Sequence, residues 1–105
     1  MLLDIVMTDD NRRMTAKVSG DIDAAQRKAL KAGLEEKIQE FKPETVEIDC
    51  GALDYIDSTG LGVLVSALRP VKEYGGEIRI TKLKPFLMKI FRITGLDDIF
   101  VLEEQ

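Results

Sequence analysis

Apolar and polar residues alternate at the start of this chain, which is the period-two pattern of a half-buried strand. Residues 2–8 and 12–19 therefore predict two strands, and the turn-forming residues 9–11 are expected to join them. Residues 19–23 follow and are interpreted as a loop. The chain is thus expected to open with two neighbouring strands.

A helical period comes next, and residues 24–41 predict the first helix. Asp23 is placed to cap its N-terminus, and Gln26 three residues later completes a variant of the capping box. The helix is expected to end before Pro43, because the residue preceding a proline avoids the α conformation. Its predicted buried stripe consists of Leu30, Leu34, Ile38 and Phe41.

Residues 46–68 predict a strand, a tight acidic loop and a second helix in succession. Pro70 predicts a kink or an early end of that helix near Leu68, with one more turn to Tyr74 still allowed, because proline cannot donate a backbone hydrogen bond. The inward positions are predicted to be Val46, Ile48 and Cys50 in the strand, and Leu61, Leu64, Val65 and Leu68 in the helix.

The last part of the chain repeats the change from strand to helix. Gly75-Gly76 predicts a stop, and residues 77–81 predict a strand. Pro85 suits the first position of a third helix, Gly95 can supply its left-handed end, and residues 99–102 predict a short last strand. The predicted inward positions are Ile78 and Ile80 in the strand, and Phe86, Leu87, Ile90 and Phe91 in the helix.

This order of elements predicts the fold class. Strands separated by helices pair in parallel through right-handed crossovers. Alternating strands indicate a sheet with one well-covered face. We therefore expect an α/β fold, namely a small mixed β-sheet with helices packed mainly on one face, formed by residues 1–105 as a single domain.

Composition narrows the function. The net charge of -4 gives no reason to expect a nucleic-acid partner, and no apolar run approaches the length of a membrane span. The chain has no histidine, which removes the usual general base of a hydrolase and argues against an enzyme. The single cysteine, Cys50, fits a reducing cytoplasm and is expected to be buried and inert.

The loop before the second helix carries the candidate chemistry. Ser58 falls at the expected N-cap, where its hydroxyl would accept a backbone hydrogen bond. The same helix end favours an anion, including a phosphate carried by the serine itself, so a simple capping role and a phosphate-acceptor role are compatible. Gly60 and Gly62 leave the first turn without bulk, which would let another molecule approach.

Other motifs are weaker. Gly60 and Gly62 lack the third glycine of a dinucleotide fingerprint, and no phosphate-binding Gly-Lys-Ser/Thr sequence occurs, so no cofactor is expected. Four aspartates could gather at one end of the sheet and hold a hard cation. Capping and turn roles explain two of them better, and we predict no metal site. The four aspartates are Asp21, Asp23, Asp54 and Asp57.

Several of these segments together resemble the STAS domain, and within it the bacterial anti-sigma-factor antagonists. The resemblance covers nearly the whole chain, and its most specific part is the Asp-Ser-Thr-Gly-Leu-Gly sequence of residues 57–62. The segments that carry the resemblance are 20–23, 46–49 and 55–62, with support from 75–76 and 94–97.

The resemblance implies partner switching in transcription regulation. The unmodified antagonist binds an anti-sigma factor that is also a serine kinase, and this frees a sigma factor. The kinase then phosphorylates the serine that aligns with Ser58 and ends the interaction, and a PP2C-type phosphatase restores the active form. The implied partner-binding residues are Asp23, Asp57, Ser58, Thr59, Gly60 and Gly62.

Two departures and two alternatives accompany this interpretation. Pro70 is unusual in the second helix, and Lys82-Leu83-Lys84 replaces a loop that often carries Asn-Pro-like residues in relatives. A second hypothesis within the same fold is a scaffold or an accessory subunit of a transporter, in which the Ser58 helix end docks on another protein without phosphorylation. A third hypothesis is a module that binds a small anion, nucleotide or lipid at the Ser58 helix end.

Overall fold

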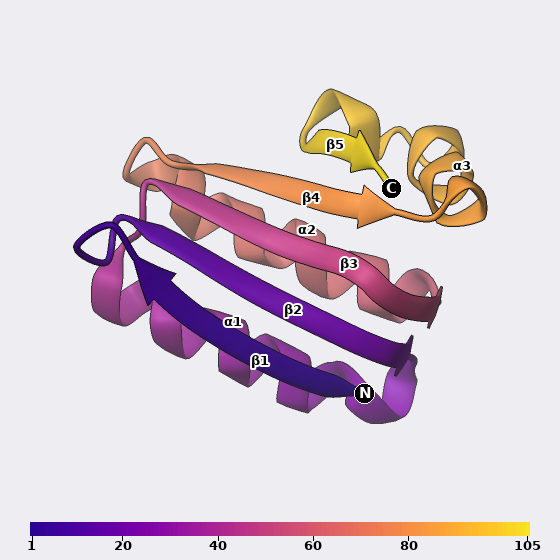
Figure 1. Ribbon diagram of the computed structural model, residues 1–105, viewed down its shortest axis with the longest axis horizontal. Coiled ribbons are helices and arrows are strands. Elements are labelled where there is room, and N and C mark those ends of the chain that lie inside the picture. Colours follow the sequence, from indigo (N-terminus) through magenta and orange to yellow (C-terminus); the bar gives the residue numbers. More distant parts are fainter.

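The computed structural model describes residues 1–105 and contains one five-stranded sheet (Figure 1). Two short 3-10 turns, η1 and η2, accompany three α-helices. The elements in chain order are β1 (Leu2–Thr8), β2 (Arg13–Ile22), η1 (Ala24–Gln26), α1 (Arg27–Phe41), β3 (Thr45–Ile56), α2 (Ser58–Glu73), β4 (Glu77–Leu83), α3 (Pro85–Ile93), η2 (Leu96–Asp98) and β5 (Val101–Glu104).

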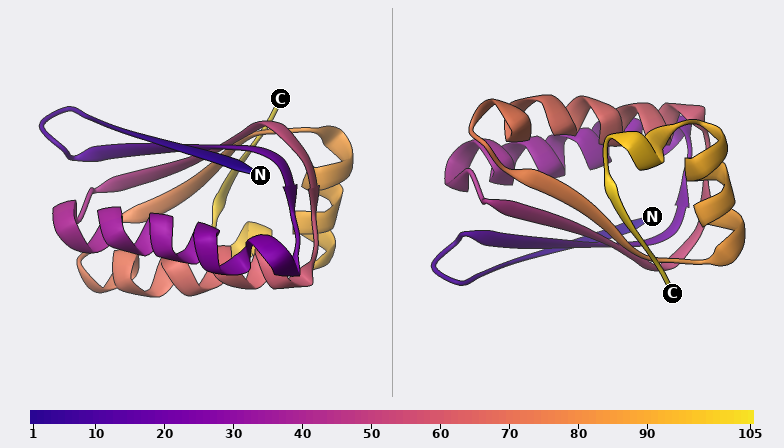
Figure 2. Two further views of the ribbon diagram at one scale, coloured as in Figure 1. Left: turned by 90° about the horizontal axis from the view of Figure 1, so that it is seen from below. Right: turned by 90° about the horizontal axis from the view of Figure 1, so that it is seen from above.

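The sheet is mixed, as the sequence predicts. Its strand order follows the chain order, with β1 antiparallel to β2 and every other neighbouring pair parallel. Figure 2 shows α1 and α2 side by side across one face, while α3 lies beyond the end of β4. The expected layout, with helices mainly on one face, is therefore confirmed. This layout brings the starts of α1 and α2 to the same end of the molecule (Figure 1).

The core lies between the sheet and the α1–α2 layer. The predicted inward residues of β3, β4 and α1 are buried, except that Phe41 is only half-buried. Two predicted core residues are wrong, because Val65 of α2 and Phe86 of α3 are exposed. The buried residues of α2 are the predicted Leu61, Leu64 and Leu68 together with Val63, Ala67 and Val71. Those of α3 are the predicted Leu87 and Phe91 together with Met88.

Strand β2 is longer than predicted, so the loop assigned to residues 19–23 is wrong. Gly20 pairs with Leu53 of β3, and after a shift in register Ile22 pairs with Ile56. Gly20 has a positive φ of 81°, a conformation that glycine adopts without strain. A one-residue bulge in β3, between Leu53 and Tyr55 and opposite Gly20, lets the pairing continue where the sequence alone indicates a break. Strand β3 extends equally far, so Asp57 is the single residue between β3 and α2.

Pro70 does not end α2 early. The helix continues to Glu73, which includes the one further turn that the sequence allows. Val71 is fully buried, and its packing holds the last turn despite the missing N–H of Pro70. The predicted stop at the glycine pair is confirmed, with Gly75 at φ 85° and the Gly76 N–H donating to the Val71 carbonyl at 2.9 Å.

Cys50 is buried in the core, as expected, and burial raises the pKa of its thiol from 9.0 to about 12, with a further contribution from the negative charge of Asp49. The thiolate fraction near pH 8 should be about 1000-fold lower in the folded chain than in the unfolded chain. Because the pKa is higher in the folded chain, the folded chain holds the thiol proton more tightly than the unfolded chain. The contribution of this proton to folding stability is therefore complete below pH 9 and is lost as the pH rises toward 12.

We predict that the folded protein resists alkylation of Cys50 by iodoacetamide at pH 8, and that the same thiol reacts fully in denaturant. Mass spectrometry of the intact chain over time gives both rates. Rapid alkylation under native conditions, without loss of the circular dichroism signal, would show that the thiol is accessible and that its assigned burial is wrong.

Candidate functional site

Asp57 joins the end of β3 to the start of α2. Its N–H donates to the Ile22 carbonyl at 3.1 Å, and its carboxylate accepts a hydrogen bond from the Gly60 N–H at 2.9 Å. Asp57 is therefore the N-cap of α2, and the prediction that Ser58 occupies this position is wrong by one residue. The pairing of β3 with β2 runs to Ile56, which leaves Asp57 in the extended conformation that a cap requires.

Ser58 is consequently the first residue inside the helix. Its side chain is exposed, and its hydroxyl makes no hydrogen bond within the chain. Because Asp57 already satisfies the cap, no structural role occupies the Ser58 oxygen. The hydroxyl lies at the positive end of the α2 dipole, where a negative group attached to it is favoured.

The two glycines of this turn have different environments. Gly60 is buried, and a Cβ built on it would lie 2.7 Å from Cγ2 of Ile22 and 2.8 Å from Cγ1 of Ile56. The expectation that Gly60 opens the helix end to another molecule is therefore wrong, because this glycine permits close packing of α2 against the sheet. Gly62 is exposed, and a Cβ built on it would have no atom within 4 Å. Gly62, and not Gly60, therefore leaves the surface of α2 open to another molecule.

Asp23 caps the turn that leads into α1. Its carboxylate accepts a hydrogen bond from the Ala25 N–H at 3.0 Å. The predicted capping box is wrong in its second half, because the Gln26 side chain forms no cap hydrogen bond. A 3-10 turn, η1, separates Asp23 from α1, so the spacing that a capping box needs is lost.

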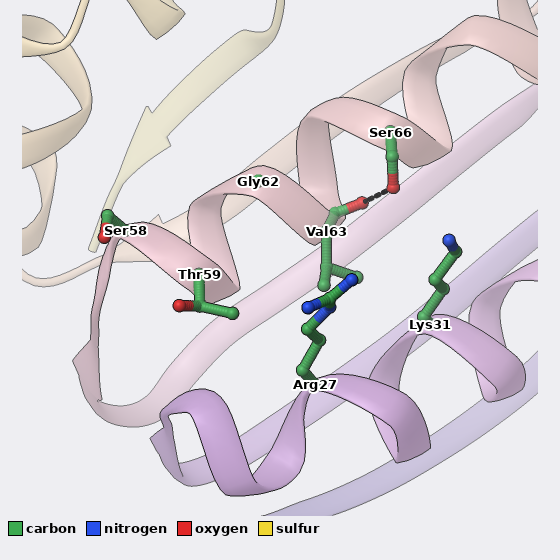
Figure 3. Close-up of a pocket in the computed structure, with 7 residues that line it drawn as sticks. All are labelled: Arg27, Lys31, Ser58, Thr59, Gly62, Val63 and Ser66. Carbon is green, nitrogen blue, oxygen red and sulfur yellow. Dashed lines mark hydrogen bonds between the residues drawn. The ribbon is translucent and has the colours of Figure 1, made fainter.

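A cavity of about 290 Å³ lies between the first turns of α1 and α2. Figure 3 shows Arg27 and Lys31 extending from α1 toward α2, with Thr59 turned to the same space and Ser58 at its far end. Neither Arg27 nor Lys31 is among the site residues predicted from the sequence. The lining residues are Arg27, Lys31, Ser58, Thr59, Gly62, Val63 and Ser66.

The four aspartates considered for a cation do not gather, since the chain holds no group of three or more acidic, cysteine or histidine side chains suited to a metal ion. Asp23 and Asp57 are caps, and Asp54 accepts from Nζ of Lys84 at 2.9 Å. The expectation that Lys82-Leu83-Lys84 is a loop is wrong, because β4 runs to Leu83 and only Lys84 separates it from α3. Lys82, within β4, pairs with Asp49 at 3.2 Å. These two ion pairs connect the end of β4 and the residue after it to β3.

Several known proteins are similar to this chain. Residues 4–105 match the model of the STAS domain. The anti-sigma-B factor antagonist of Listeria monocytogenes is 37% identical over 82% of this chain and 75% of its own length, and that of Bacillus subtilis is 30% identical over 94% and 89%.

The fold also matches a solved structure. The anti-sigma-factor antagonist SpoIIAA in its unphosphorylated form superimposes with a TM-score of 0.77 at 15% identity, covering 99% of this chain and 88% of that one. Its phosphorylated form, from Bacillus, gives a TM-score of 0.75 at 18% identity, covering 96% and 90%. None of the helices of this chain combines the length and apolar character needed to span a membrane.

If Asp57 and not Ser58 caps α2, substitutions at the two positions should differ in their effect on stability. Replacing Asp57 with Ala should lower the free energy of unfolding by about 0.5–2 kcal/mol, because the Gly60 N–H loses its partner. Replacing Ser58 with Ala should change it by less than about 0.5 kcal/mol, since the exposed hydroxyl bonds to nothing in the chain. Urea unfolding of both variants measures the difference, and a larger loss from Ser58→Ala would contradict the assignment.

The glycines form a second matched pair. Gly60→Ala should destabilise the domain by about 1–3 kcal/mol, because Ile22 and Ile56 are buried and cannot move away from the added methyl group. Gly62→Ala should be neutral or stabilise the helix by up to about 1 kcal/mol. Thermal unfolding measures the stability of both variants. An equal change in the two would show that Gly60 and Gly62 do not differ in their packing.

Proposed function

This chain belongs to the STAS domain family and, within it, to the anti-sigma-factor antagonists, and we propose that it is the binding component of a partner switch. In its unmodified form it binds an anti-sigma factor and thereby releases a sigma factor. Phosphorylation of Ser58 ends this binding. The observation that carries the proposal is the exposed Ser58 hydroxyl, which has no hydrogen bond inside the chain and lies at the first turn of α2.

The proposal requires an external enzyme for each direction of the switch. The chain has no histidine and no nucleotide-binding motif, so the phosphate must come from another protein. We assign this role to the anti-sigma factor itself, acting as a serine kinase, and the reverse role to a PP2C-type phosphatase. Both would act in the cytoplasm, where the sigma factor is released.

Phosphorylation is expected to act at the interface and to leave the fold unchanged. A phosphate adds about 1.5 to 2 negative charges and three acceptor oxygens. The helix dipole accommodates this charge locally, and the exposed side chain needs no repacking. A docked partner would have to desolvate the same charge beside Asp57, and an unmatched charge at an interface costs roughly 2–5 kcal/mol.

The docking surface is proposed to centre on Ser58 and to include Thr59 and Gly62 of α2, with the capped turns of Asp23 and Asp57 at its border. Thr59 is turned toward α1 (Figure 3). Gly62 is exposed, with no atom within 4 Å of the position that a Cβ would take, so it leaves space for a partner. Gly60 supports this surface from beneath, because its backbone N–H holds Asp57 and its missing side chain admits Ile22.

We predict that Ser58→Ala abolishes phosphate incorporation by the partner kinase and leaves its affinity for the partner within about threefold of the unphosphorylated natural chain, since the side chain is small and exposed. Ser58→Asp should weaken binding by tenfold or more, at about 1.4 kcal/mol per decade, with an unchanged circular dichroism spectrum. Mass spectrometry of the Ser58 peptide and titration calorimetry measure the two effects.

Ser66→Ala serves as the matched control on the same helix, because the Ser66 hydroxyl donates to the Val63 carbonyl at 2.8 Å and is not expected to accept phosphate. This variant should incorporate phosphate at the rate of the unmodified chain. Phosphate found on another residue, or loss of binding by a folded Ser58→Ala variant, would contradict the proposed switch.

A further inference from the structure

Helix α1 begins with positive charges in an unfavourable place. Arg27 and Lys28 occupy its first turn, Lys31 follows one turn later, and the first turn contains no acidic residue. The N-terminus of a helix carries a partial positive charge, so cations there oppose the dipole. A sequence selected for stability alone would place acidic residues at these positions, which indicates that the cations serve another purpose.

These cations are not neutralised within the chain. Arg27 and Lys28 take part in no ion pair, and Lys31 reaches only Oε1 of Glu35, at 4.0 Å. The nearby carboxylates of Asp23 and Asp57 point to backbone N–H groups instead. The start of α1 therefore presents free positive charge on a chain whose net charge is -4.

The three cations line two adjoining hollows. The first is the cavity between α1 and α2, and the second, of about 400 Å³, is lined by Ala24, Ala25, Arg27, Lys28 and Lys31. Arg27 and Lys31 contribute to both, so the hollows form one continuous surface, which we call the basic groove. Small residues such as Ala24 and Gly62 also line the basic groove. Ser58 lies at one end of it (Figure 3).

We propose that the basic groove docks an acidic segment of the protein that recognises Ser58. This inference rests on the proposed function and names the chemistry of the partner's contact. The groove extends on both sides of Arg27, which suits several carboxylates along a chain, and no aromatic ring lines it to stack on a nucleotide base. Small residues, Ala24, Ala25 and Gly62, leave room for the partner backbone.

The groove also gives the switch a physical basis. Ser58 lines the same cavity as Arg27 and Lys31, so a phosphate on Ser58 would lie beside the docked carboxylates. Like charges at an interface repel, and the phosphate would compete with the acidic segment for the same cations. The basic groove thus attracts the partner before modification and makes binding sensitive to the added charge.

The test compares two double variants with the same change in charge. Arg27→Glu/Lys31→Glu alters the groove, and Arg69→Glu/Lys72→Glu alters two exposed cations toward the other end of α2. The groove variant should bind the purified anti-sigma partner at least about tenfold more weakly than the control, with a weaker dependence of affinity on salt. Its thermal midpoint should change little, because Glu at position 27 complements the helix dipole, whereas Glu at position 31 replaces the weak Lys31–Glu35 pair with a like-charge pair.

The outcomes separate the two proposals. If the unmodified chain does not bind the partner at all, the proposed function fails. If it binds but the groove and control variants weaken equally, or neither weakens, the groove inference is wrong and the proposed function stands. Binding of ATP or inorganic phosphate to the isolated domain, lost in the groove variant, would identify a small-anion site and overturn the acidic-segment proposal. Should the double variant fail to fold, Arg27→Gln against Arg69→Gln repeats the comparison.

Discussion

The hydrogen bond from the Gly60 N–H to the Asp57 carboxylate determines what Ser58 is free to do. It closes the first turn of α2 without using the serine, and the same Gly60 packs directly on Ile22 and Ile56. A side chain at Gly60 would push the helix from the sheet. Packing in the core therefore sets the position of the Ser58 hydroxyl, which we propose as the switch. That hydroxyl makes no hydrogen bond that the fold needs.

This separation explains how a charged modification can be tolerated. The first turns of α1 and α2 lie side by side and both present a positive helix end, to which Arg27, Lys28 and Lys31 add full charges. A phosphate is thus added where the domain's own electrostatics favour an anion. These cations lower the stability of the start of α1, and we propose that they are present because they bind the partner. Local conflicts of this kind concentrate at functional sites.

Much of the fold follows from local periodicity, because alternation and helical stripes depend on neighbours along the chain. The parts that do not follow depend on contacts between distant segments. Residues 19–22 read as a loop until β3 is placed beside them, and only that pairing shows that Asp57, and not Ser58, is the cap. Gly60 and Gly62 look alike in sequence and differ only in what lies opposite them. Arg27 enters the site because α1 packs beside α2, although cations at a helix start are a signal that sequence analysis can use.

The central claim is that a phosphate on Ser58 changes what can dock at the start of α2 and leaves the body of the domain alone. The most direct measurement compares the backbone amide NMR spectra of the isotope-labelled domain before and after stoichiometric phosphorylation of Ser58. If the phosphate acts only at the interface, the shifts are confined to residues 57–62 and the facing turn of α1, and the signals of β2, β3 and the buried face of α2 do not change. Shifts spread through the sheet and the core would show instead that modification rearranges the fold.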